Sequence, residues 1–144
     1  MKRVARSAIV ERGAEAMYDL VVDVEAYPGF LPWCAAAQVR EHSPGRSVAT
    51  LVLGAKGLRR SLTTENTLVP GRSIDMRLVE GPFRKFEAQW RFTPLGERAA
   101  RVEFAVQYEF SSRVAAALLE PIFARIADST VDAFCRRAQS VPGG

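Results

Sequence analysis

The sequence predicts an α+β fold: a curved seven-stranded antiparallel sheet around one long C-terminal helix, with short helices after the first strand. Two observations carry this prediction. The middle of the chain alternates apolar and polar residues in segments at hairpin spacing. From Ser112 to about Ser140, apolar residues instead recur every three to four positions, as on a helix. Because a hairpin-linked sheet must bury one face, we expect the long helix to cover it.

The first part of the chain predicts one strand and a short helix. Residues 2–11 alternate in the manner of a half-buried strand, and from Ala14 the apolar residues fall on one helical face. The helix cannot run far past Tyr27, because Pro28 pushes the residue before it out of the α region. The connector over residues 28–33 is unusually apolar, which predicts inward packing or a functional role.

Six further strands are predicted in the middle of the chain, separated by turn residues such as Ser43-Pro44-Gly45. The clearest is the last, in which the residues from Val102 to Phe110 alternate between an apolar face and a polar face. We therefore expect one buried sheet face. The predicted strands span residues 34–43, 46–55, 58–68, 72–80, 83–94 and 99–110.

The C-terminal stretch predicts a helix with clear end signals. Ser111 and Ser112 supply an N-cap, and Arg136 and Arg137 place positive charge in the last turn, where it suits the helix dipole. Pro121 is the anomaly, because a proline inside a helix removes one hydrogen bond and should bend or break it.

An apolar cavity between sheet and helix follows from these elements. A strongly twisted sheet curls, and one helix rich in alanine does little to fill the trough. A fully packed core explains the same apolar pattern, and the pattern does not distinguish the two. The candidate ligand-binding residues are Phe30, Leu31, Trp33, Phe83, Trp90, Phe104, Leu118, Ile122, Phe123 and Ile126.

Size and composition set the class of protein. A chain of 144 residues corresponds to about one domain, so we predict a single domain over residues 1–144. No apolar run approaches the roughly 20 residues that span a bilayer, and charged residues interrupt any signal-peptide pattern. We therefore expect a cytoplasmic protein. The net charge of +4 is mild and charges of both signs are interspersed, which argues against a DNA-binding protein.

The residues that could carry chemistry are few. With two cysteines and one histidine the chain falls short of the four ligands of a structural zinc, so no metal site is predicted. Cys34 and Cys135 are expected as reduced thiols. His42 falls at a strand end beside a turn, and no cationic neighbour is evident to lower the pKa of Cys34. We therefore predict no catalytic residues and a protein that is not an enzyme.

Four segments resemble the coenzyme Q-binding START-domain family, in its bacterial branch of RatA-like ribosome-association toxins within the polyketide cyclase/dehydrase-like superfamily. The most specific is the run Tyr27-Pro28-Gly29-Phe30-Leu31-Pro32-Trp33-Cys34 within the first of them. The resemblance covers essentially the whole chain and implies a helix-grip fold, as in START and Bet v 1-like proteins. The segments are Tyr18–Cys34, Leu78–Arg84, Trp90–Gly96 and Val102–Phe110.

The resemblance implies a non-catalytic protein that holds ubiquinone or a similar polyprenyl lipid in the cavity and supports respiratory electron transfer. No covalent cofactor is implied, the partner is an apolar lipid, and transient contact with the inner membrane fits such a role. Burial of an isoprenoid tail is favourable at about 25 cal/mol per Å² of apolar area.

The same resemblance implies two other functions. One is a toxin that blocks the association of ribosomal subunits, for which basic side chains would meet phosphates. The other is an enzyme of cyclase or dehydratase type, which needs a titratable group facing the cavity. The residues available for ribosome contact are Lys56, Arg59, Arg60, Arg84 and Lys85.

Overall fold

The predicted α+β architecture is confirmed by a computed structural model, which describes residues 1–55 and 57–141. The predicted elements all occur, and most of their bounds agree to within two residues. In chain order the elements are β1 (Lys2–Val10), α1 (Ala14–Val22), the 3-10 helix η1 (Val24–Gly29), β2 (Cys34–Ser43), β3 (Arg46–Ala55), β4 (Leu58–Val69), β5 (Ser73–Glu80), β6 (Phe83–Gly96), β7 (Ala99–Phe110) and α2 (Arg113–Ser140).

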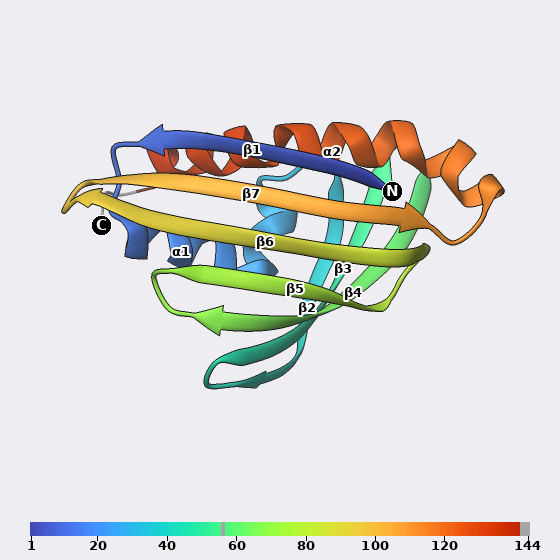
Figure 1. Cartoon of the computed structure of the whole chain (residues 1–144), viewed down its shortest axis with the longest axis horizontal. Helices are drawn as coiled ribbons and strands as arrows, with labels where there is room; N and C mark the ends of the chain where they lie inside the picture. The colour runs from blue at the N-terminus through green and yellow to red at the C-terminus, as the bar shows by residue number, and fades with distance from the viewer. Residues whose placement is uncertain (56, 142–144) are drawn as a thin grey trace.

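The strands form one antiparallel sheet in the order β1-β7-β6-β5-β4-β3-β2. Strands β2 to β7 follow one another as hairpins, and β1 joins the far edge by pairing with β7, with Val4 opposite Val106. Figure 1 shows β3 and β4 running at a steep angle to β6 and β7, so the sheet curves around α2. This is the strong twist expected of a sheet with many strands.

Strand β6 runs two residues past its predicted end at Pro94. At this point β6 pairs only with β7, because the pairing with β5 stops at Arg91 opposite Ser73. A proline has no backbone N–H to donate, so it is tolerated at a position where one side of the strand makes no hydrogen bonds to a neighbouring strand.

Helix α2 is a single helix of 28 residues that Pro121 does not break. Its N-cap is confirmed, because the Ser112 hydroxyl accepts a hydrogen bond from the Ala115 backbone N–H at 3.0 Å. The proline frees the carbonyl of Ala117 from its helical partner. Both Ala117 and Pro121 are exposed, so water can reach that carbonyl.

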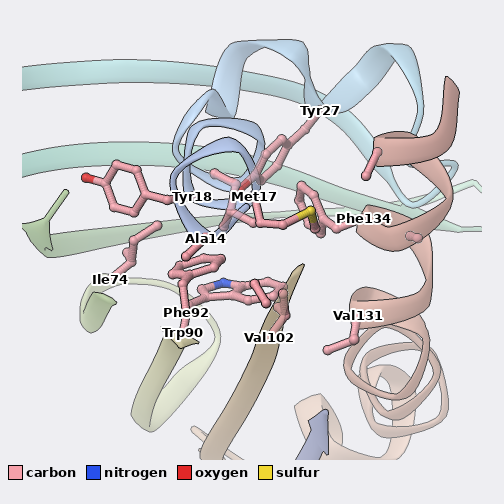
Figure 2. Close-up of a cluster of buried hydrophobic side chains, with 14 of the residues drawn as sticks. Ala14, Met17, Tyr18, Tyr27, Ile74, Trp90, Phe92, Val102, Val131 and Phe134 are labelled. Atoms are coloured by element: carbon pink, nitrogen blue, oxygen red, sulfur yellow. The ribbon is translucent and has the colours of Figure 1, made fainter. Parts of the chain in front are cut away.

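Two clusters of buried side chains lie between the sheet and α2. One gathers side chains from α1, η1 and the far half of α2 around Trp90 and Phe92, and Figure 2 shows these side chains pointing toward one another. The other surrounds Phe83, Tyr108 and Phe123 near the start of α2. None of the helices in residues 1–55 and 57–141 combines the length and hydropathy needed to cross a membrane.

Candidate functional site

An apolar cavity of about 90 Å³ lies between the concave face of the sheet and α2. Strand alternation builds it, because every second residue of β3 to β7 points inward. A water needs about 10–15 Å³ of such space, so the cavity has room for several waters or a small organic group. Its walls are formed by Val21, Val22, Val24, Tyr27, Trp33, Ser47, Leu51, Leu53, Leu62, Asn66, Leu68, Ile74, Met76, Phe86, Ala88, Trp90, Phe104, Phe123, Ile126, Ala127, Thr130 and Phe134.

Aromatic contacts build one wall of the cavity. Trp90 lies 4.7 Å from Phe104 and 5.4 Å from Phe134, measured between ring centroids. Phe134 also meets Tyr27 edge-to-face at 5.3 Å. The Tyr27 hydroxyl donates to the carbonyl of Val21. Burial raises the pKa of the Tyr27 hydroxyl. The connector after α1 is therefore fixed to the far half of α2.

Three polar residues interrupt the otherwise apolar lining. Ser47 and Asn66 lie opposite each other on β3 and β4, and Thr130 lies on α2. The Thr130 hydroxyl donates to the carbonyl of Ile126 at 2.6 Å, which satisfies it within its own helix. Ser47 and Asn66 bond to each other at 3.2 Å, so the cavity has one polar region on the sheet side.

A surface groove of about 370 Å³ adjoins the cavity between the apolar connector, the end of β3 and α2. Trp33 and Ile126 line both spaces, so these two side chains separate the cavity from the groove. The indole N–H of Trp33 is buried and has no hydrogen-bond partner within the described residues. A third and smaller cavity, of about 30 Å³, also reaches Ile126.

Most of the predicted ligand-binding residues line these spaces. Trp33, Trp90, Phe104, Phe123 and Ile126 line the main cavity. The smaller cavity is lined by Phe83 and Ile122, the second of which also lines the groove.

Three predicted residues lie elsewhere. Leu31 is packed in the core at 1% exposure, and Phe30 packs on Phe134 under the guanidinium of Arg137. Leu118 is 52% exposed, because it lies about 100° around the helix from Leu119, whose side faces the sheet.

Ser47, Asn66 and Thr130 were not predicted. An apolar alternation points to the large hydrophobic side chains of a buried face and not to the polar ones among them. A signal was present: β4 places Leu62, Asn66 and Leu68 on the same face, so a polar residue falls within an apolar alternation.

Of the basic residues proposed for ribosome contact, the four that the structure describes lie at one end of the sheet. Arg59 and Arg60 lie in β4, in the part of that strand that extends past the end of β5. The last residue of β5, Glu80, pairs with Thr63. Arg60 lines the smaller cavity together with Pro82 of the β5–β6 turn, which brings the two segments together.

Arg84 and Lys85 follow that turn. Arg59, Arg60, Arg84 and Lys85 are all exposed, and Arg84 lies 3.5 Å from the carboxylate of Glu109. Lys56 lies outside the described residues.

Near the site, a thiol and a phenol have raised pKa values, and the histidine lies away from it. Burial raises the pKa of the Cys34 thiol, which disfavours the nucleophilic thiolate. His42 is exposed at the end of β2. Tyr108 donates to Glu120 at 3.2 Å, and burial, with the carboxylate as a second cause, raises the pKa of Tyr108 to about 12. Cys34 and Cys135 are both free.

Comparison with known proteins gives both a family and a fold. Residues 10–135 match the family model described as polyketide cyclase / dehydrase and lipid transport. A Vibrio cholerae protein named ribosome association toxin RatA is 44% identical over 143 residues, which cover 99% of each chain.

Two further matches are more distant. A Xenopus laevis protein named coenzyme Q-binding protein COQ10 homolog B, mitochondrial, is 29% identical over 143 residues, covering 96% of this chain and 59% of that one. The crystal structure of the Zhui aromatase/cyclase from Streptomyces sp. R1128 superposes with a TM-score of 0.85 at 19% identity, covering 96% of this chain and 93% of that one. At that identity the likeness concerns the fold alone, and it is the helix-grip fold that the sequence predicts.

Proposed function

This chain belongs to the polyketide cyclase / dehydrase and lipid transport family, and we propose that it is a RatA-like factor that binds a ribosomal subunit and hinders subunit association. The observation that carries the proposal is the 44% identity, over nearly the whole of both chains, to a protein named ribosome association toxin. The coenzyme Q-binding relative is more distant, at 29% identity. The ribosome therefore takes precedence over the quinone as the expected partner.

The basic end of the sheet is the surface we assign to this contact. It comprises Arg59, Arg60 and Arg84, which are exposed and come from two neighbouring segments. Arg59 and Arg60 are adjacent in β4 and point to opposite faces of the sheet, so they do not form one flat patch, and a partner that contacts both must reach around this end of the sheet. Arginine guanidinium groups suit ribosomal RNA because they donate in a planar fork to phosphate oxygens. Arg84 has a carboxylate neighbour in Glu109, but an exposed ion pair of this kind is worth little and exchanges readily for a phosphate.

We propose that the protein acts by binding and not by catalysis. The cavity wall offers aromatic and aliphatic groups with a serine, an asparagine and a threonine, none of which titrates near neutral pH. The raised pKa of Cys34 and the position of His42 support this proposal. We also retain the expectation of a cytoplasmic protein.

Co-sedimentation with purified ribosomal subunits at two salt concentrations tests the ribosome proposal. We expect binding that weakens steeply with salt, as phosphate contacts do. Replacing Arg59, Arg60 and Arg84 with glutamine should weaken binding and lower the salt slope by roughly one for each phosphate that is no longer neutralised.

The matched control replaces three exposed arginines at the opposite end of the sheet: Arg72 in the β4–β5 turn, Arg98 in the β6–β7 turn and Arg101 in β7. This control removes the same charge from another place, so it should leave most of the binding intact. Equal loss in both triple variants would show that net charge alone drives binding and would contradict the assigned surface.

A second function is favoured by the apolar cavity: the protein takes up an apolar ligand. Ligand pockets usually measure about 300–1,000 Å³, whereas this cavity measures about 90 Å³. Ubiquinone or another polyprenyl lipid would therefore enter only if Trp33 and Ile126 moved apart and joined the cavity to the groove. Those two side chains are the point where the wall is thinnest, because they alone line both spaces among the described residues.

Mass spectrometry of an organic extract of the protein, purified from a quinone-producing host, tests the second function. A stoichiometric quinone or polyprenyl lipid is the expected result. An empty protein that also takes up no added quinone would count against a lipid ligand.

A further inference from the structure

The inner face of β3 and β4 carries a buried polar cluster formed by Ser47, Thr64 and Asn66. These side chains are only 7%, 4% and 5% exposed, respectively. Along β4 they are flanked on the same face by Leu62 and Leu68, both buried. Burial of an amide is unfavourable unless its polar atoms find partners. A polar cluster at this place therefore calls for a partner or a function.

Hydrogen bonds within the cluster fix the orientation of the Asn66 amide. The Thr64 hydroxyl donates to Asn66 Oδ1 at 2.8 Å, and Asn66 Nδ2 donates to Ser47 Oγ at 3.2 Å. The amide oxygen thus faces Thr64 and its NH₂ group faces Ser47. This places the donor side of the amide next to the serine hydroxyl.

Two hydrogen-bond donors of the cluster are left over. An asparagine amide has two N–H donors and a serine hydroxyl has one O–H donor. Within residues 1–55 and 57–141, one Nδ2–H of Asn66 bonds to Ser47, and Ser47 acts only as an acceptor. The second N–H of Asn66 and the O–H of Ser47 have no acceptor there, and both residues line the cavity.

A neighbouring pair of donors in an apolar wall matches the two lone pairs of one carbonyl oxygen. A hydrocarbon would leave both protein donors unpaired. Thr130 does not alter this pattern, because its hydroxyl already donates to its own helix.

We propose that Ser47 and Asn66 form the polar end of a binding site for a mostly apolar carbonyl compound, such as a ketone, quinone or ester. The carbonyl oxygen accepts from Asn66 Nδ2 and Ser47 Oγ, and the apolar part of the molecule lies against Trp90 and Phe104. The proposal rests on the second function above, that the cavity takes an apolar ligand, and it adds the chemical class of that ligand.

Two probes of nearly identical shape test the proposal. Acetophenone and α-methylstyrene differ in that a carbonyl oxygen of the first is a methylene group in the second. Their dissociation constants are measured by NMR titration of the folded protein, in which the indole N–H resonance of Trp90 in the cavity wall is followed in every variant. In the unmodified protein the side-chain NH₂ resonances of Asn66 are followed as well. We expect the Asn66 resonances to shift with acetophenone and to move little with α-methylstyrene.

Two variants remove the donors. Asn66→Leu keeps the approximate shape of the side chain and should weaken acetophenone binding about tenfold, a typical value for a lost hydrogen bond. Ser47→Ala removes one donor and is the smaller change. It can therefore be measured if Asn66→Leu does not fold. Neither variant should weaken the binding of α-methylstyrene.

Thr63→Val is the matched control, because Thr63 lies on the opposite face of β4 and bonds to Thr50 at 2.7 Å. It should change neither affinity. If Asn66→Leu and Ser47→Ala leave the ratio of the two affinities as in the unmodified protein, the polar site is overturned while the cavity remains a ligand site. If neither probe binds, both the polar site and the second function are overturned.

Discussion

Replacing Phe134 with alanine should destabilise the protein more than most single substitutions. Phe134 is 1% exposed and meets Tyr27, Phe30 and Trp90 edge-to-face at 5.3, 5.4 and 5.4 Å. It is the side chain through which α2 holds both the connector and β6. Its removal forfeits these aromatic contacts, each worth about 0.5–1.5 kcal/mol beyond burial.

The expected loss in the free energy of unfolding is about 3–5 kcal/mol, the usual cost of a buried Phe→Ala change. A value near the top of this range is expected, because Phe134 already lines the cavity. Its removal enlarges an existing empty space, which costs about 24 cal/mol for each Å³. For a domain of this size the melting temperature should fall by roughly 10–15 °C.

Urea denaturation followed by tryptophan fluorescence measures the loss. Phe134→Leu also loses the aromatic contacts but leaves a smaller cavity, so it should cost less than the alanine variant; it serves if the alanine variant is too unstable to purify. Leu118→Ala on the same helix is the control, because Leu118 is 52% exposed and should change stability by about 0.5 kcal/mol or less. A loss for Phe134→Ala no larger than that of the control would refute the role assigned to this side chain.

Three further substitutions have distinct expected outcomes. Ala88→Leu places extra carbon atoms in the cavity, since Ala88 is buried in its wall; it should abolish acetophenone binding yet leave ribosome binding unchanged, and loss of both would show that the two activities are not separate. Ser112→Ala removes the N-cap of α2 and should cost about 1 kcal/mol, whereas Ser111→Ala, measured in the same urea titration, should cost about 0.5 kcal/mol or less. The pKa of Tyr108 is raised to about 12 from the ordinary value of 10.0, so the folded state holds the phenol proton more tightly and this stabilisation is present below pH 10 and lost as the pH rises through 12. As the pH rises from 10 to 12, Tyr108→Phe should therefore lose less stability than the unmodified protein. Identical losses would contradict the raised pKa of Tyr108.

Strand alternation was the strongest guide to the fold. Val102 to Phe110 predicted β7 because one face of that strand is buried and the other is not. The same alternation located Trp90 and Phe104 on the cavity wall. The expectation that Pro121 would bend or break α2 was wrong in its stronger form, because sequence alone does not show that the carbonyl it frees lies at an exposed position.

The candidate site was harder to predict than the fold. Leu118 and Ile122 share a helical stripe, but only the docking angle of α2 decides which of them reaches the groove. Ser47 and Asn66 become neighbours only through the register of β3 and β4, which depends on the hairpin that joins those strands. The volume of a cavity depends on how side chains pack together, and no pattern along the chain records it.

The most direct test of the proposed function is the joining of purified ribosomal subunits in the presence of this protein. Light scattering follows the formation of the joined ribosome while the protein is titrated in. We expect the joined fraction to fall as the protein concentration rises, and to fall much less with the variant that lacks Arg59, Arg60 and Arg84. Unchanged joining at concentrations where the protein is bound to a subunit would contradict the proposed function.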